Sequence, residues 1–175
     1  NDTNNVIRCH ISIWIVIAIV VIILFLLDRE IYRYEGIHVG SRLQAWLYDR
    51  WAEKYDHDKQ ASQTQDVEFL ARPLLAKLSD VPEPFILDVA TGTGRLPFAL
   101  MSQPDFKGGM IAMDISRGML TQAAKKLASH RERASLVQYE KFPLPFPDET
   151  FDVVSCVEAL ELIGEKKAAV TELAR

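Results

Sequence analysis

The chain has 175 residues, a formal net charge of −4 and 25% charged residues, which leaves room for one domain and a short appendage. The mildly acidic balance provides no basic stripe or patch, and this argues against a nucleic-acid-binding protein. The two cysteines, Cys9 and Cys156, and the four histidines are dispersed, so neither a disulfide framework nor a metal site is predicted.

The first feature along the chain is an apolar run at residues 11–27, which contains no charge, glycine or proline. Its length is close to the lower limit for a membrane span, and nothing else in the chain could bury a helix that is apolar on every side. The charged residues Asp-Arg-Glu follow at 28–30, where a signal peptide would have a small-residue cleavage site. We therefore expect a retained transmembrane anchor.

The positive-inside rule assigns an orientation to this anchor. Arg8 precedes the apolar run, whereas Arg29, Arg33 and Arg42 follow it closely. The prediction is a single-pass membrane protein whose main domain faces the cytoplasm. Because the chain starts with Asn1 and stops inside a predicted helix, we expect it to be incomplete at both ends.

Five segments are expected in chain order: an N-terminal tail (1–10), the anchor (11–27), a juxtamembrane linker (28–40), a helical region (41–80) and an α/β core (81–175). The helical region has apolar residues at three-to-four spacing in two stretches, one from Ser41 and one from about Asp66 to Leu78. In the core, strands at 85–89, 110–113, 136–139 and 151–156 alternate with helices at 94–102, 116–131 and 165–175. This alternation predicts an α/β fold with a doubly wound, mostly parallel sheet.

The strand at 85–89 runs through Asp88 into a turn with two glycines, Gly92 and Gly94, and then into a helix. Glycine has no Cβ, so a ligand can approach the backbone closely there, and the helix start offers unpaired N–H groups. Ligands of open α/β sheets bind at the carboxyl ends of the strands. A plain strand-to-helix turn would use the same glycines, so the pair alone does not decide between the two interpretations.

Three further details favour an adenosyl cofactor over a dinucleotide. Asp88 precedes the glycines, where it would repel a pyrophosphate but suits an ammonium group or hydroxyls. Pro97 occupies the place of the third glycine of a dinucleotide fingerprint, which counts against NAD and FAD. Asp114 ends the next strand and can bind two ribose hydroxyls, and the alternative role of helix cap fits Ser116 better.

These segments resemble the class I S-adenosylmethionine-dependent methyltransferases, of the kind that includes quinone-biosynthesis and small-molecule enzymes. Residues 87–94 (LDVATGTG) look like the first motif of that family, and Asp114-Ile115-Ser116 with Met119-Leu120 looks like the second. Residues 144–154 (LPFPDETFDVV) look like the stretch that leads into the fourth strand. Residues 48–56 (YDRWAEKYD) are similar to a helix that covers the cofactor in many members. Three motifs in order are far more specific than any one of them.

The resemblance implies a Rossmann-like sheet, of which four of about seven strands are present, and S-adenosylmethionine as the cofactor. Asp114 would bind the ribose, Glu140 would lie near the adenine amino group, and Cys156, between Ser155 and Val157, would lie beside the methionine moiety. The full set of implied cofactor contacts is Asp88, Ala90, Thr91, Gly92, Gly94, Asp114, Ile115, Met119, Glu140, Lys141 and Cys156.

The implied activity is methyl transfer to a small-molecule, lipid or quinone acceptor, which an anchor would hold near the bilayer. The cofactor carries the reactive carbon, so no dedicated nucleophile is needed and no catalytic residue is assigned. Glu158 and Glu161 are candidates for a base by position, although a solvated helix start explains them as well. Two alternatives stay open: another adenosyl-group transferase on the same fold, and a non-catalytic or truncated cofactor-binding domain.

Overall fold

The four predicted strands form one parallel sheet in the computed structural model, which describes residues 2–38, 40–60, 65–139 and 141–175. The strands are β1 (Phe85–Val89), β2 (Gly109–Asp114), β3 (Ala134–Gln138) and β4 (Val153–Ser155). Their order in the sheet is β3-β2-β1-β4, and every neighbouring pair is parallel. The order reverses between β1 and β4, and this topological switch point is where open α/β sheets bind ligands. The prediction of an α/β fold with a parallel sheet is confirmed.

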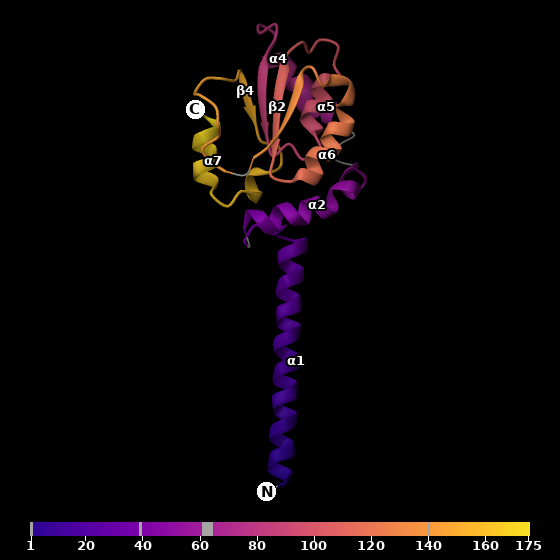
Figure 1. The fold of residues 1–175 in the computed structure, drawn as a ribbon, viewed down its shortest axis with the longest axis vertical. Helices are drawn as coiled ribbons and strands as arrows, with labels where there is room; N and C mark the ends of the chain where they lie inside the picture. The colour runs from indigo at the N-terminus through magenta and orange to yellow at the C-terminus, as the bar shows by residue number, and fades with distance from the viewer. Residues whose placement is uncertain (1, 39, 61–64, 140) are drawn as a thin grey trace.

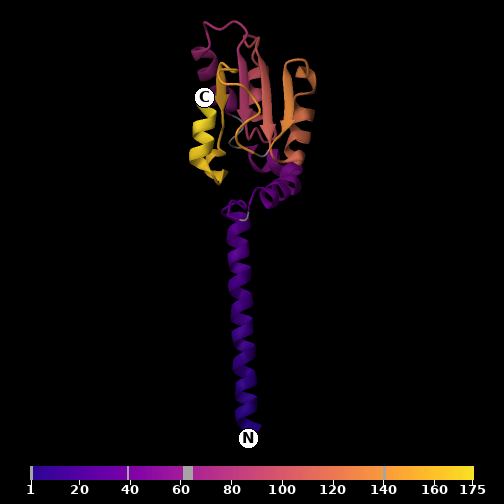
Figure 2. The same cartoon turned by 60° about the vertical axis from the view of Figure 1, so that its left-hand side comes forward.

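Helices and turns connect the strands and precede them (Figure 1). Before the sheet come α1 (Asp2–Tyr32), α2 (Ser41–Asp58), the π-helical turn η1 (Val67–Ala71) and α4 (Arg72–Lys77). Between and after the strands come α5 (Arg95–Met101), α6 (Arg117–Lys126), η2 (Ala128–His130), η3 (Leu160–Leu162) and α7 (Lys166–Leu173). Figure 2 shows α2 lying across the end of the sheet to which the strands point.

Apolar side chains of β1 alternate between the two faces of the sheet, because successive residues of a strand point to opposite sides. On one face Ile86 belongs to a buried cluster with Leu100 and Phe106, to which η1 and α4 contribute partly buried residues. On the other face Leu87 packs in a second cluster with Leu144, from the loop between β3 and β4, and with Leu173 of α7. Because both faces of the sheet are packed against other elements, the strand sequences are nearly continuous apolar runs.

Several boundaries differ from the predicted ones. The helix after Ser116 ends at Lys126 instead of about Arg131, because the chain tightens into the short turn η2. β4 ends at Ser155, which leaves Cys156 beyond the strand. In α2 the spacing of apolar residues predicted a helix correctly, but Trp46 remains 49% exposed because the helix contacts α6 and the strand ends rather than an apolar core.

The predicted transmembrane anchor is not supported by the structure. Residues 11–27 lie within α1, which projects from the α/β unit (Figure 1). Among the residues whose side chains are described, no helix combines the length and the apolar character that a membrane crossing requires. The cytoplasmic location of the main domain stays a prediction.

Candidate functional site

A pocket of about 620 Å³ lies at the switch point of the sheet, between the carboxyl ends of the strands and α2. Its volume is in the usual range for small-molecule sites. The sheet side is lined by residues 88–93, by residues 113–115 and by residues 157–159. The opposite side comes from α2 and the segment before it, with Ile37, Gln44, Tyr48 and Tyr55. The lining therefore combines a polar half at the strand ends with an aromatic and apolar half under α2.

The turn after β1 bends sharply because three of its residues have positive φ angles: 57° at Ala90, 56° at Gly92 and 78° at Gly94. An added Cβ at Gly92 would meet nothing within 4 Å, so the backbone is bare toward the pocket. At Gly94 an added Cβ would lie 3.2 Å from the Cβ of Ala123, which shows how closely the start of α5 approaches α6. The Thr91 N–H donates to the Met113 carbonyl at 2.9 Å and ties the turn to β2.

Asp88 is buried at the end of β1, with only 2% of its surface exposed, and it lines the pocket. The hydroxyl of Ser155, its partner in β4, donates to its carboxylate at 2.7 Å. Burial raises the pKa of Asp88 to about 6, against the opposing effect of that hydrogen bond. Nearby, the Thr91 hydroxyl is the one buried side-chain polar atom of the described residues without a hydrogen-bond partner, and Thr91 also lines the pocket. A buried hydroxyl at the pocket wall can donate a hydrogen bond to a ligand bound there.

Asp114 is buried at the end of β2 and holds two strand-end turns together. Its carboxylate accepts from the Gly92 N–H at 2.7 Å and from the Ser116 N–H at 2.8 Å. Burial raises its pKa, and the backbone hydrogen bonds oppose that effect. The Ser116 hydroxyl accepts from the Met119 N–H at 3.0 Å and caps α6, which confirms that Ser116 and not Asp114 is the cap. A carboxylate has about four acceptor sites, so Asp114 retains capacity for two hydroxyls.

Two aspartates of α2 attach this helix to the far side of the pocket. Asp49 accepts from the Ser116 hydroxyl at 2.6 Å and from the Gly118 N–H at 2.7 Å, at the start of α6. Asp56 accepts from the Thr93 hydroxyl and forms an ion pair with Lys126, with 2.7 Å between Oδ2 and Nζ. We call α2 with these contacts the lid. Both aspartates lie in the segment 48–56 that resembles a cofactor-covering helix, but the sequence interpretation assigned no contact to either of them.

Arg95 is a pocket-lining residue that the sequence interpretation missed, although it directly follows the glycine turn. Its guanidinium forms a bidentate contact with Asp66, at 2.6 Å and 3.0 Å, and a third contact with Glu158 at 2.9 Å. It thereby joins the segment before η1 to the segment after β4. Glu158 lines the pocket, but its side chain is 63% exposed and is engaged by Arg95, while Glu161 is exposed and does not line the pocket.

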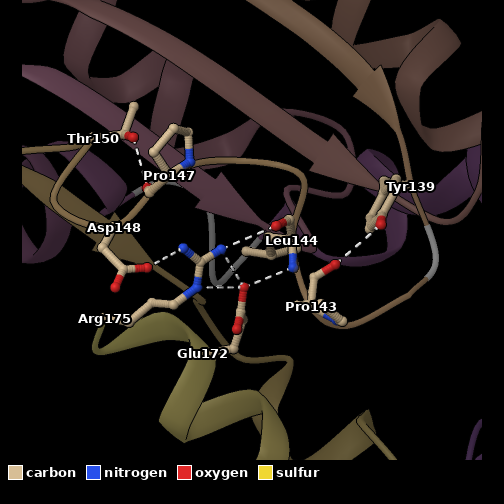
Figure 3. Close-up of polar contacts among 8 residues, drawn as sticks. All are labelled: Tyr139, Pro143, Leu144, Pro147, Asp148, Thr150, Glu172 and Arg175. Atoms are coloured by element: carbon tan, nitrogen blue, oxygen red, sulfur yellow. Dashed lines mark hydrogen bonds and ion pairs between the residues drawn. The ribbon is translucent and has the colours of Figure 1, made fainter.

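A network of polar contacts holds the loop between β3 and β4, which supplies the pocket residue Leu144 (Figure 3). Glu172 of α7 accepts from the Leu144 N–H at 2.7 Å, and Arg175 donates to the Leu144 carbonyl at 3.0 Å. Arg175 also pairs with Glu172 and with Asp148, each at 2.6 Å. The hydrogen bonds from Arg175 keep the pKa of Glu172 below its usual value. The C-terminal helix thus positions one wall of the pocket.

Most of the predicted cofactor residues meet in this pocket. Eight of them line it: Asp88, Ala90, Thr91, Gly92, Asp114, Ile115, Met119 and Lys141. Gly94 and Cys156 do not line it, since Gly94 packs against α6 and the Cys156 side chain lies beyond β4, where burial raises the pKa of its thiol to about 11. Glu140 lies outside the described residues. Within the described part of the chain, no group of three or more histidine, cysteine or acidic residues could hold a metal ion.

The buried carboxyl of Asp88 should make stability depend on pH. Its pKa rises from 3.8 to about 6 on folding, so the folded chain holds a proton there between these values while the unfolded chain loses it. The stabilisation relative to Asp88→Asn should be full below about pH 4 and be lost as the pH rises through 6, by on the order of 2 kcal/mol. Denaturant unfolding of both proteins from pH 4 to pH 7 measures this difference, and a constant difference would contradict it.

Comparison with known proteins gives consistent matches. Residues 86–175 match a family described as "Methyltransferase domain". The demethylmenaquinone methyltransferase of Symbiobacterium thermophilum is 33% identical over 131 residues, which are 74% of this chain and 52% of that protein. A ubiquinone/menaquinone biosynthesis C-methyltransferase of Xanthomonas campestris is 34% identical over 92 residues, which are 51% and 36% of the two chains.

A solved structure is similar over most of the described fold. It comes from a proposed S-adenosylmethionine-dependent methyltransferase of Methanococcus maripaludis and is 20% identical. The superposition has a TM-score of 0.64 and covers 73% of this chain and 57% of the other. At this identity the likeness shows a shared fold.

Proposed function

Because the chain belongs to the family of methyltransferase domains, we propose that it binds S-adenosylmethionine at the strand ends and that its methyl group passes to a quinol-type ring. Membership confirms the predicted methyltransferase class. The chain spans 52% and 36% of the two curated relatives described above. The activity of the whole protein and its acceptor are therefore both part of the proposal.

The observation that carries the proposal is the pair of buried carboxylates on either side of a bare glycine turn. Asp114 has two free acceptor sites for the ribose hydroxyls, and Asp88 offers a negative charge for the ammonium group of the methionine moiety. The unpartnered Thr91 hydroxyl would gain a hydrogen bond from the same moiety. Gly92 leaves room for the cofactor to lie against the backbone. These residues fit S-adenosylmethionine in charge, in hydrogen bonding and in space.

Two of the predicted contacts take different roles in this proposal. Gly94 lets α5 approach α6, where the Cβ of Ala123 leaves little space for a side chain. Cys156 lies outside the pocket lining, so the neighbouring Val157 would contact the methionine moiety instead. Lys141, Ile115 and Met119 line the pocket near the ends of β2 and β3 and would surround the adenine.

The chemistry supplied by the bound cofactor is an electrophilic methyl group on a sulfonium. The chain contributes position and environment: Asp88 and Asp114 orient the donor, and the lid excludes water from the reacting atoms. The aromatic and apolar half of the pocket would hold the acceptor, with Tyr48, Tyr55 and Leu162 among its lining residues. The names of the relatives above support a quinone-type acceptor.

Calorimetric titration with S-adenosylhomocysteine, S-adenosylmethionine and NAD tests the cofactor assignment. We expect both adenosyl sulfur compounds to bind and NAD to bind more weakly by at least about tenfold, since Asp88 repels a pyrophosphate. Binding of NAD alone would overturn the proposal. Transfer of tritium from S-adenosylmethionine labelled on the methyl group to 1,4-naphthoquinol then separates methyl transfer from aminopropyl transfer and from binding without turnover.

A further inference from the structure

A tyrosine and a glutamate form a pair at the lid side of the pocket. Tyr48 of α2 lines the pocket, and its hydroxyl donates a hydrogen bond to Oε2 of Glu35, in the connection between α1 and α2. Burial, followed by the hydrogen bond to Glu35, raises the pKa of Tyr48 above its usual value. The Tyr48 phenol therefore stays protonated and donates a hydrogen bond to the Glu35 carboxylate.

The connection between α1 and α2 holds Glu35 in an uncommon backbone conformation. Its φ angle is 50°, and that of the buried residue Gly36 is 78°. An added Cβ at Gly36 would lie 3.0 Å from Leu47 Cδ1, so the turn packs tightly against α2. Across the turn, Glu30 accepts from the His38 N–H at 3.0 Å. A residue other than glycine is strained in the left-handed region, and such residues cluster at functional sites.

The surroundings of the pair suit a ring that carries a hydroxyl. A tyrosine oxygen that donates its proton can still accept hydrogen bonds. The pocket near the pair is lined by Ile37, two residues after Glu35, and by Leu162 and Ile163 at the end of η3. The side-chain amide of Gln44 donates to the Leu162 carbonyl at 3.2 Å and so connects α2 to η3. The Tyr55 ring, with its centroid 6.4 Å from that of Tyr48, adds a second aromatic wall. An apolar ring held there would have Tyr48 as a partner for its hydroxyl.

We propose that Tyr48 and Glu35 form a proton relay for the methyl acceptor. The acceptor O–H bond breaks, its proton passes to the Tyr48 oxygen, and the Tyr48 proton passes to the Glu35 carboxylate. The electron pair enters the ring, a ring carbon forms the bond to the methyl group, and the electrons of the broken S–C bond stay on sulfur. The methylated carbon then loses its hydrogen as a proton to water, while the relay returns its proton to the ring oxygen. The balance is one methyl transferred and one proton released.

The inference rests on the proposed function, but its first test measures binding rather than turnover. The probes are 2-naphthol and 2-methoxynaphthalene, which share a ring system and differ in the ability to donate a hydrogen bond. Dissociation constants are measured by calorimetry with and without S-adenosylhomocysteine. We expect the full chain to bind 2-naphthol about tenfold more tightly than the ether, and Tyr48→Phe to lose this preference. Tyr34→Phe is the matched control, since its ring contacts His38 outside the pocket lining.

Three outcomes would overturn the relay: no preference for the naphthol in the unaltered chain, a preference that survives Tyr48→Phe, or no binding of either probe. Failure of S-adenosylhomocysteine to bind would instead contradict the proposed function. Glu35→Gln separates a relay from a simple hydrogen bond, because glutamine still accepts from Tyr48 but takes up no proton. In the naphthoquinol assay this variant should lower kcat at least tenfold with little change in KM, and an unchanged kcat would contradict proton transfer to Glu35.

Discussion

Asp114→Asn is expected to weaken the binding of S-adenosylhomocysteine by roughly 100-fold or more. The carboxylate would accept two ribose hydroxyls while it keeps its bonds to the Gly92 and Ser116 N–H groups. A hydrogen bond to a charged group contributes about 1.5–3 kcal/mol, and the loss of two of them corresponds to at least about 3 kcal/mol. The amide of asparagine has one oxygen and presents a donor in place of the other, so it cannot serve all four partners.

The control for this variant is Asp105→Asn, which changes an exposed aspartate with the same substitution. Titration calorimetry at one pH and one salt concentration measures both affinities, and circular dichroism shows whether the sheet is intact. An Asp114→Asn protein that is folded and binds S-adenosylhomocysteine within threefold of the unaltered chain would contradict the ribose assignment.

Gly118→Ala is expected to detach the lid. An added Cβ at Gly118 would lie 2.8 Å from the Cα and 2.9 Å from the carbonyl oxygen of Asp49, both of which are backbone atoms. The clash removes the two hydrogen bonds that Asp49 accepts at the start of α6. Their loss lowers the free energy of opening α2 by about 3 kcal/mol, so the equilibrium constant for opening rises roughly 100-fold. Alanine is a better helix former than glycine by about 1 kcal/mol, so the effect cannot come from a weaker α6.

Hydrogen exchange of the α2 amides measures this opening directly. Protection in α2 should fall by about two orders of magnitude, while β1 and β2 keep theirs because the core clusters do not include Gly118. Thr121→Ala, at an exposed position of the same helix, serves as the control and should leave α2 protected. Equal protection of α2 in both variants would show that the Asp49 contacts do not hold the lid.

The sheet could be predicted from the sequence because its signals are local. β1 has the predicted bounds, since an apolar run followed by a glycine turn permits few other interpretations. The end of α6 was placed too late because Leu127 continues the apolar period, although the chain has already left the α-helix there. The apolar period predicts which side chains are buried, but it does not predict where the backbone hydrogen bonds change from an α-helix to a tighter turn.

The helix at 48–56 was expected to cover the cofactor, but the contacts that attach it and the junction at Arg95 could not be predicted in the same way. Asp49, Asp56 and Asp66 bind partners that are 67, 37 and 29 residues away in the chain, so no local pattern identifies them. Each carboxylate looks like an ordinary solvated charge until the fold supplies its donor. The acids that end β1 and β2 were found because strand ends have a known place in an open α/β sheet.

The two Tyr-Asp pairs of α2 also fix a distance. Asp49 is hydrogen-bonded to the start of α6, and Asp56 to the glycine turn. The tyrosines that precede them, Tyr48 and Tyr55, line the pocket. Seven residues of α-helix separate the pairs and span about 10 Å. A shift of α2 along α6 would break the hydrogen bonds of Asp49 and of Asp56 at the same time, so these contacts fix the position of the helix. The spacing of the two pairs therefore fixes how far apart Tyr48 and Tyr55 lie along the wall of the pocket.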